Sequence, residues 1–282
     1  MAIIGPAGRR RPCVPDGSES TLVGIQEEGR SSGMQVMNKP PGAWGGLVQR
    51  DGSVHPPALT PGYKTSVARS PRQAPISFGG GATEAAGPVF GHGLVGKTDS
   101  DLLTNYATPG ESAIGPRIVV MGRLLDGGGH PLPGALIEVW QANSGGRYRH
   151  KRDGYLAPLD PNFGGCGRCV TDAEGWYAFR TVQPGPYPWP NRANDWRPAH
   201  IHFSVFGTAF AQRLVSQLYF EGDPLIDLCP IVNTIPDKAA IDRLVARLDM
   251  SATIPMDARV YRFDIVLRGR RQTPFETRME GL

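Results

Sequence analysis

Short runs in which apolar and polar residues alternate recur along the chain from residue 117 onward. They are rich in β-branched and aromatic residues, are separated by Gly and Pro, and cover residues 117–125, 135–140, 176–182, 200–206, 214–220 and 259–267. A period of two turns one face of each segment toward a core, which is the pattern of β-strands. We therefore predict a mainly β protein, an antiparallel β-sandwich or barrel with a few short helices.

Two segments have a helical pattern instead. One begins at Asp237, a suitable N-cap, and has apolar residues at helical spacing on one face: Ile241, Leu244, Val245 and Leu248. The other covers residues 100–106. Long irregular stretches at 144–170 and 183–199 predict loops, and loops of that length in a compact domain usually carry function. The basic segment around Tyr63, Arg69 and Arg72 is typical of a solvated surface.

Composition agrees with a turn-rich globular protein. The 282 residues include 37 Gly and 27 Pro, which argues against a helical bundle. The formal net charge is only +4 and no long Lys/Arg tract is present, so nucleic acid is not an expected partner. No apolar run approaches the roughly 20 residues that cross a membrane. Four cysteines in a chain of this length do not indicate a disulfide scaffold.

The first 45 residues differ from the rest. They contain 13 Gly or Pro residues, one aromatic residue and no sustained apolar period. We expect residues 1–45 to form an irregular or disordered tail and residues 46–282 to form the β-sandwich domain. The N-terminus lacks the pattern of a signal peptide, so the expected location is the cytoplasm.

Two short motifs match known sites but lack the required context. Residues 91–98 read GHGLVGKT, the letters of a phosphate-binding P-loop with Lys97 and Thr98. No buried strand precedes them and no βαβ alternation follows, so a Gly-rich loop is the stronger interpretation. Cys166 and Cys169 form a single CxxC without a second pair, which is weak evidence for zinc or for redox chemistry.

His200 and His202 form the most informative motif. Two residues apart on a strand, they point to the same face and can bind one ion, while Ile201 points into the core. A third ligand is needed. Asp195 and Glu221 are the nearby carboxylates, but neither has a clear ligand spacing. The other candidates are Tyr148 and Tyr187, which lie in the two long loops.

The acidity of tyrosine explains why two tyrosines could join the two histidines at one metal ion. A phenol with a pKa near 10 ionises at neutral pH only beside a strong cation. Two phenolates and one hydroxide would make a ferric centre formally neutral, so the site could be buried without an unpaired charge. Two Tyr and two His together are therefore compatible with a non-haem Fe(III) centre.

Several long motifs resemble the intradiol ring-cleavage dioxygenases. They are GGRYRHKRDGYLAPLDPNFGG at 145–165, PGPYPWPN at 184–191, NDWRPAHIHF at 194–203, QLYFEGDPLI at 217–226 and YRFDIVLRG at 261–269. The likeness runs from about residue 55 to residue 277 and includes TPGYKTS and RSPRQ near its start. It implies a β-sandwich that carries iron in its loops, in agreement with the strand pattern.

The resemblance also implies roles for individual residues. The expected Fe(III) ligands are Tyr148, Tyr187, His200 and His202, with Tyr187 as the ligand that substrate displaces. Arg197 and Gln217 match residues beside the bound catechol. The walls of the substrate pocket are expected to include Tyr63, Trp140 and Trp189. The second cysteine, Cys166, departs from the pattern of the family.

The implied reaction is cleavage of protocatechuate (3,4-dihydroxybenzoate) by O₂ to 3-carboxy-cis,cis-muconate, in the β-ketoadipate pathway of aromatic catabolism. The resemblance further implies assembly with a related alpha chain that lacks iron. Three alternatives stay open at this point. The substrate could be plain catechol or hydroxyquinol, the chain could be a sandwich-type binding module without iron, or residues 91–98 could bind a nucleotide.

Overall fold

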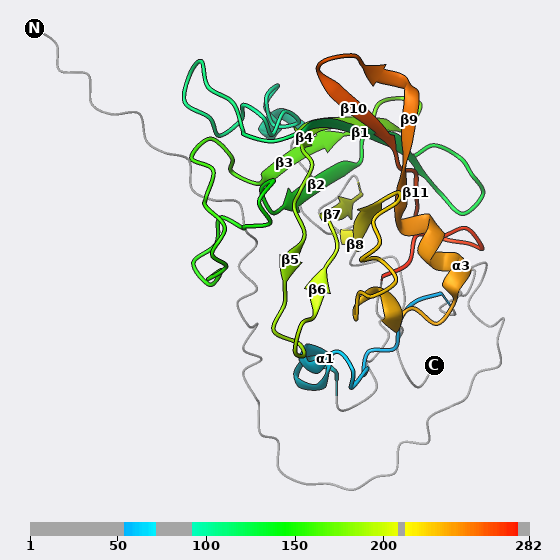
Figure 1. The fold of residues 1–282 in the computed structure, drawn as a ribbon. Helices are drawn as coiled ribbons and strands as arrows, with labels where there is room; N and C mark the ends of the chain where they lie inside the picture. Colours follow the sequence, from blue (N-terminus) through cyan, green and yellow to red (C-terminus); the bar gives the residue numbers. More distant parts are fainter. Residues whose placement is uncertain (1–53, 72–91, 208–211, 276–282) are drawn as a thin grey trace, which may run out of the picture. The chain divides into compact units, whose positions relative to one another are not determined.

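β-Strands make up most of the regular structure of this computed structural model, which describes residues 54–71, 92–207 and 212–275 (Figure 1). The strands are β1 (Arg117–Leu125), β2 (Leu136–Gln141), β3 (Cys166–Val170), β4 (Trp176–Val182), β5 (Tyr187–Pro188), β6 (Trp196–Arg197), β7 (His200–Phe206), β8 (Gln212–Phe220), β9 (Val245–Ile254), β10 (Ala258–Arg262) and β11 (Ile265–Val266). The predicted mainly β class is therefore confirmed.

One large sheet contains all of these strands except β5 and β6, which form a separate two-stranded ribbon. Its pairings run β4-β1-β10-β9 in one half and β8-β7-β2-β3 in the other, with β11 also paired to β1. A short pairing of β8 with β9 joins the halves. The sheet is mixed and not purely antiparallel, since β1 pairs in parallel with β10 and β11, as does β8 with β9.

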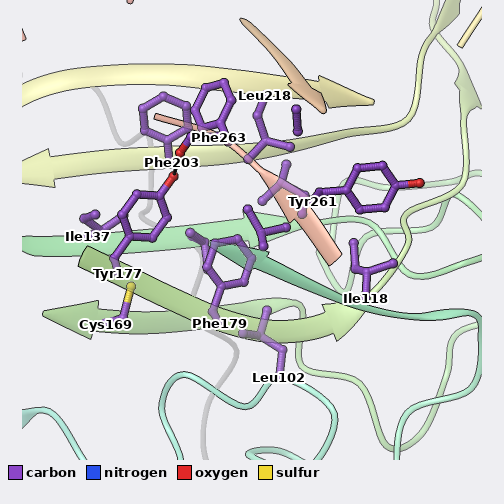
Figure 2. Packing of buried hydrophobic residues seen from close by; sticks show 14 of the residues in the cluster. Leu102, Ile118, Ile137, Cys169, Tyr177, Phe179, Phe203, Leu218, Tyr261 and Phe263 are labelled. Carbon is purple, nitrogen blue, oxygen red and sulfur yellow. Dashed lines mark hydrogen bonds between the residues drawn. The ribbon is translucent and has the colours of Figure 1, made fainter. Parts of the chain in front are cut away.

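A large apolar core lies between the two halves of the sheet. Buried residues of β1, β4 and β10 belong to the same apolar cluster as those of β2, β7 and β8 (Figure 2). Phe203 of β7 meets Phe263 at a ring-centroid distance of 5.5 Å, and Phe220 of β8 meets Tyr261 at 5.0 Å. The two halves therefore act as the layers of a sandwich, as predicted.

The predicted strands are largely confirmed. β1, β4 and β7 have the predicted bounds, whereas the run at 259–267 is interrupted between β10 and β11. The irregular stretch 144–170 ends in β3, which lacks a clear apolar alternation. The irregular stretch 183–199 contains only the two short strands of the ribbon. The predicted tail, residues 1–45, lies outside the described residues.

The helix predictions are less accurate. Asp237 caps a helix, because its side chain accepts a hydrogen bond from Ala239 N–H, but α3 (Lys238–Ile241) and the following η3 (Asp242–Leu244) then give way to β9. Residues 100–106 form turns and a bridge rather than a helix. The segment after Tyr63, expected to be a solvated surface, forms α1 (Lys64–Arg69), which is exposed except at Ser66. The remaining short helices of the described residues are η1 (His92–Leu94) and η2 (Val232–Thr234).

Candidate metal centre and substrate cavity

The predicted histidines lie on the face of β7 that points away from the core. Ile201, between His200 and His202, is fully buried in the core cluster, as strand alternation requires. The register extends this outer face to the neighbouring strands, where His202 lies opposite Trp140 of β2 and Gln217 of β8. The sheet therefore provides a rigid platform for the histidines.

Four predicted ligand side chains converge on this platform. His200 Nε2 lies 3.4 Å from Tyr148 OH, 3.4 Å from Tyr187 OH and 3.2 Å from His202 Nε2. The rings of the two tyrosines meet edge to face at 5.5 Å. The structure thus brings together two strand histidines and two loop tyrosines that lie up to 54 positions apart in the sequence.

Neighbouring groups fix the orientation of both imidazole rings. His200 Nδ1 lies 2.7 Å from the carbonyl oxygen of Pro198. A carbonyl only accepts, so Nδ1 carries the proton and Nε2 presents its lone pair to the other three side chains. The His202 ring stacks on Trp140 with a centroid distance of 4.9 Å and an interplanar angle of 4°. Both histidines are therefore held in place before any ligand binds.

Glycines allow the two tyrosine loops to touch. Gly146 has a φ of +84°, and a Cβ there would lie 2.3 Å from Pro186 O. A Cβ on Gly185 would lie 2.5 Å from Ser144 O. Larger residues at these two positions would separate the loops, so this close approach of the backbones is what brings Tyr148 and Tyr187 together.

Each tyrosine is also positioned by its own loop. Asp153 accepts hydrogen bonds from the backbone N–H groups of Tyr148 and Tyr155, both at 2.8 Å. Tyr187 lies in the two-stranded ribbon, directly opposite Arg197. Nothing in the sequence distinguishes Asp153 from other loop carboxylates, and its role is evident only from these contacts.

Burial keeps all four side chains uncharged in the absence of a cation. It raises the pKa of Tyr148 well above its usual value, with a further contribution from Tyr187. Burial also raises the pKa of Tyr187, although the positive charge of Arg197 opposes this effect. The pKa of His202 is lowered to about 3 by burial and by Arg197, and that of His200 also falls well below its usual range because of burial.

This donor set fits a metal ion. Metal–nitrogen bonds of about 2.1 Å with angles of about 90–120° place ligand atoms about 3.0–3.6 Å apart, and the separations from His200 Nε2 fall in that range. Two neutral imidazoles and two phenols provide lone pairs and two ionisable protons. A cation that ionises both phenols would gain two negative ligands in a buried site.

A carboxylate ligand, the alternative considered from the sequence, is not supported. The described residues contain no group of three or more His, Cys, Asp or Glu side chains that could hold a metal ion. Asp195 accepts a hydrogen bond from Asn191 at 2.9 Å. Glu221 pairs with Arg247 at 3.0 Å. Both carboxylates therefore bind partners other than the histidines.

A buried arginine network lies beside the candidate ligands. Arg197 Nη2 donates to Gln217 Oε1 and to Tyr219 OH, the latter at 3.4 Å, and Tyr219 OH donates to Gln217 Oε1 at 3.0 Å. Burial alone would lower the pKa of Arg197, but its interactions with Tyr219 and Tyr187 raise it, so the guanidinium stays charged. Sequence reasoning did not identify Tyr219, although its strand alternation with Gln217 was visible.

A cavity of about 610 Å³ opens onto the candidate ligands. Its wall includes Trp140, Tyr148, Tyr187, Trp189 and His202. This volume and the aromatic lining suit a small planar ligand.

Tyr63 extends the predicted substrate wall beside the cavity. It meets the Trp189 ring at 5.4 Å, and its hydroxyl accepts a hydrogen bond from Arg69. The predicted pocket residues thus belong to one region of the molecule.

Comparisons with known proteins identify the family to which the chain belongs. A family model described as "Dioxygenase" matches residues 85–269, and one described as the N-terminal part of the protocatechuate 3,4-dioxygenase beta subunit matches residues 48–79. The chain is 51% identical over 230 residues to the protocatechuate 3,4-dioxygenase beta chain of Burkholderia cepacia, covering 82% of this chain and 97% of that protein. The chain belongs to the intradiol ring-cleavage dioxygenases.

Other members of the family are more distant. The protocatechuate 3,4-dioxygenase alpha chain of Pseudomonas putida is 30% identical over 203 residues, covering 68% of this chain and 94% of that protein. A crystal structure of hydroxyquinol 1,2-dioxygenase from Pseudomonas putida DLL-E4 is 25% identical, covers 73% of this chain and 71% of its own, and has a TM-score of 0.46.

The described part of the P-loop-like segment (residues 92–98) and the CxxC pair lack the local structure of the sites that their letters suggest. In the P-loop-like segment, Gly96 N–H donates to Asp99 at 3.1 Å, and turns rather than an α-helix follow Thr98. Cys166 and Cys169 lie three residues apart on β3, so their side chains point to opposite faces of the strand. Cys166 lines the cavity, and Cys169 is buried in the core. Family membership also sets aside the interpretation as a non-catalytic binding module.

No helix in the described part of the chain has both the length and the apolar character that a membrane crossing requires.

Proposed function

We propose that this chain is the iron-bearing chain of an enzyme that cleaves protocatechuate with O₂ to 3-carboxy-cis,cis-muconate in aromatic catabolism. Two phenol oxygens and the Nε2 atom of His202 lie within 3.4 Å of His200 Nε2, and this convergence carries the proposal. The 51% identity to a protocatechuate 3,4-dioxygenase beta chain supports this substrate over catechol and hydroxyquinol, the alternatives. We assign residues 46–282 to the dioxygenase domain and keep residues 1–45 as a tail.

The proposed cofactor is non-haem Fe(III), held by the phenolate oxygens of Tyr148 and Tyr187 and by Nε2 of His200 and His202. When bound, Fe(III) would supply a Lewis acid that both oxygens of a catechol can chelate and that would activate the ring toward O₂. Two phenolates and one hydroxide would neutralise the charge of a ferric ion, so this buried site would carry no unpaired charge. Anionic oxygen ligands also favour the ferric over the ferrous state.

Tyr187 has two proposed roles. With iron bound, Tyr187 would be the ligand that the substrate displaces, and its oxygen would accept the proton of one catechol hydroxyl. Tyr187 lies in the short ribbon opposite Arg197, so the released side chain would meet a buried positive charge. This pairing stabilises a phenolate next to the metal and supports a proton exchange that leaves the net charge of the site unchanged.

Arg197 is proposed to stabilise negative charge that develops on the catechol ring. Its Nε is buried and has no hydrogen-bond partner among the described residues, while Gln217 and Tyr219 hold Nη2. A buried N–H without a partner is costly and is compatible with a donor reserved for substrate. Gln217 is then a positioning residue for Arg197.

The ring of the substrate is proposed to lie between Trp140 and Trp189, with its carboxylate toward Tyr63. The Tyr63 hydroxyl already accepts a hydrogen bond from Arg69, so its own proton is available to a carboxylate. A related alpha chain is the proposed partner, because the chain resembles both the beta and the alpha chains of protocatechuate 3,4-dioxygenase.

Visible absorption with an iron count tests the proposal. The iron-loaded protein should show a broad phenolate-to-iron band that shifts when protocatechuate is added without oxygen. Tyr187→Phe should keep its iron, lose part of the band and bind protocatechuate more slowly. Tyr106→Phe is the matched control, since this tyrosine packs under Arg149, outside the ligand cluster. A wild-type protein that stays colourless after iron loading, alone and co-expressed with an alpha-type chain, would contradict the proposed centre.

A further inference from the structure

One wall of the substrate cavity is unusually basic. The loop that follows the candidate ligand Tyr148 contributes Arg149, His150, Arg152 and Asp153 to this wall. Five of the six residues from 147 to 152 have basic side chains: Arg147, Arg149, His150, Lys151 and Arg152. Asp153 is the one carboxylate among the cavity-lining residues that the structure describes.

Most charged groups of this loop are used to build it. Arg147 donates to the carbonyl groups of Asp153, Tyr155 and Ala157. Arg149 donates to the carbonyl groups of Phe163 and Asp160. The carboxylate of Asp153 binds two backbone N–H groups and lies 4.0 Å from the Arg147 guanidinium. These three side chains therefore hold the loop in shape.

Lys151 and Arg152 have no such role in the described structure. Both are exposed, and neither forms an ion pair with any residue in the ranges 54–71, 92–207 and 212–275. The loop fixes the Arg152 backbone, since its N–H donates to His150 Nδ1 at 3.1 Å, while its side chain lines the cavity. Two uncompensated positive charges thus lie at and beside the cavity.

The proposed substrate carries a charge that these side chains can recognise. Protocatechuate has one ionised carboxylate at neutral pH, whereas catechol has none. Addition of O₂ to C₇H₆O₄ gives C₇H₆O₆, a tricarboxylic acid, so the product leaves with three negative charges. Positive charge beside the cavity therefore favours the entry of the carboxylated substrate over the neutral one.

We propose that Arg152, assisted by Lys151, determines specificity by attracting anionic catechols into the cavity. The inference rests on the proposed function and concerns how the substrate reaches that site. It assigns Arg152 a long-range electrostatic role, since the side chain is exposed and lies on the cavity wall. Two unit charges about 7 Å apart in water interact by about RT. Removing one such charge should therefore lower the rate or the affinity of substrate binding about threefold at low salt.

The test uses the iron-loaded enzyme in the assembly in which it is active. Arg152→Gln, Arg152→Glu, Arg152→Lys and Lys151→Gln are compared with Arg270→Gln, an exposed arginine that does not line the cavity. One readout is kcat/KM for protocatechuate and for catechol. The other is the anaerobic association rate of protocatechuate. Salt is varied from about 0.01 M to about 1 M, over which the Debye length falls from about 30 Å to about 3 Å.

Arg152→Gln should lower both readouts for protocatechuate about threefold at low salt, and Arg152→Glu should lower them about tenfold. Arg152→Lys should retain most of the wild-type value. The kcat/KM for catechol should change much less. At high salt, the variants and wild type should have the same kcat/KM and association rate for protocatechuate. Lys151→Gln should give a smaller effect of the same kind, and Arg270→Gln should resemble wild type.

Two results would overturn the inference. The first is Arg152→Glu with wild-type values for protocatechuate at low salt. The second is an equal loss for both substrates at every salt concentration, which would indicate a structural role. Either result leaves the proposed function intact if the wild-type enzyme turns over protocatechuate. A wild-type enzyme that binds iron but does not cleave protocatechuate contradicts the proposed function itself.

Discussion

At the residue scale, the candidate ligands show how neighbouring contacts prepare a site. His200 receives its orientation from the Pro198 carbonyl, and His202 receives its own from the stacked Trp140 ring. Loss of a group that orients a metal ligand typically lowers metal affinity by roughly ten- to a hundredfold. The stacked indole therefore has a role beyond forming a wall of the cavity.

Trp140→Ala should weaken iron binding about tenfold or more, because the His202 ring would lose the surface that fixes its plane. Trp140→Phe keeps an aromatic face at the same position and should retain most of the affinity. Competition with a chelator, followed by the visible band, measures both variants. Equal iron affinity in Trp140→Ala and wild type would show that the stack does not support the ligand.

Sequence reasoning reached some of these residues and missed others for physical reasons. The pair of histidines was recognisable because a two-residue spacing on a strand has one geometric meaning. The choice of Tyr148 and Tyr187 over Asp195 and Glu221 depended on the family resemblance, since loop geometry is not encoded in spacing. Contacts between distant segments, such as Arg197 with Tyr219, required the structure.

At the element scale, competing patterns explain which predictions failed. The apolar spacing from Ile241 to Leu248 predicts one helix, yet β9 starts at Val245 because β8 and β10 offer partners to it. Half of the β9 side chains are exposed and only Ala246 is buried, so its own sequence carries little alternation. Strand runs with one buried face, such as 200–206, were located correctly.

The loop that carries Tyr148 depends on one carboxylate, and this dependence can be tested. Asp153→Ala removes the acceptor for the N–H groups of Tyr148 and Tyr155, so the loop should loosen at a cost of about 1–3 kcal/mol. We expect a shifted or weakened phenolate band with the histidine platform intact. Asp153→Asn, which keeps one acceptor oxygen, should be milder. An unchanged band in Asp153→Ala would exclude this positioning role.

At the scale of the whole molecule, the core between the two halves of the sheet contains residues of both β3 and β4. Cys169 of β3 and Tyr177 of β4 both belong to this core (Figure 2). Burial raises the pKa of the Cys169 thiol from 9.0 to about 12 and raises that of the Tyr177 phenol well above 10.0. Both groups stay neutral in the folded protein at a pH where they ionise in the unfolded chain.

This difference predicts loss of stability in alkali. A raised folded pKa contributes stability that is fully present below pH 9 and is lost as pH rises toward 12. In this window Cys169 should reduce the free energy of unfolding by up to about 1.4 kcal/mol per pH unit. The free energy of unfolding, measured by denaturant titration, should therefore fall less steeply with pH in Cys169→Ala than in wild type. Cys166→Ala, on the same strand, is the control. Parallel slopes for wild type and Cys169→Ala would refute the assignment.

The pairing of β1 with β10 has a consequence for how the protein is made. Ile118 pairs with Arg259, which lies half the chain length away, whereas β2, β3, β7 and β8 come from the stretch 136–220. During synthesis, the half of the sheet that carries the candidate histidine ligands emerges complete while β1 still lacks its partners β10 and β11. Contacts between distant segments form slowly, and open strand edges promote aggregation. The newly made chain is therefore most vulnerable just before its last strands leave the ribosome.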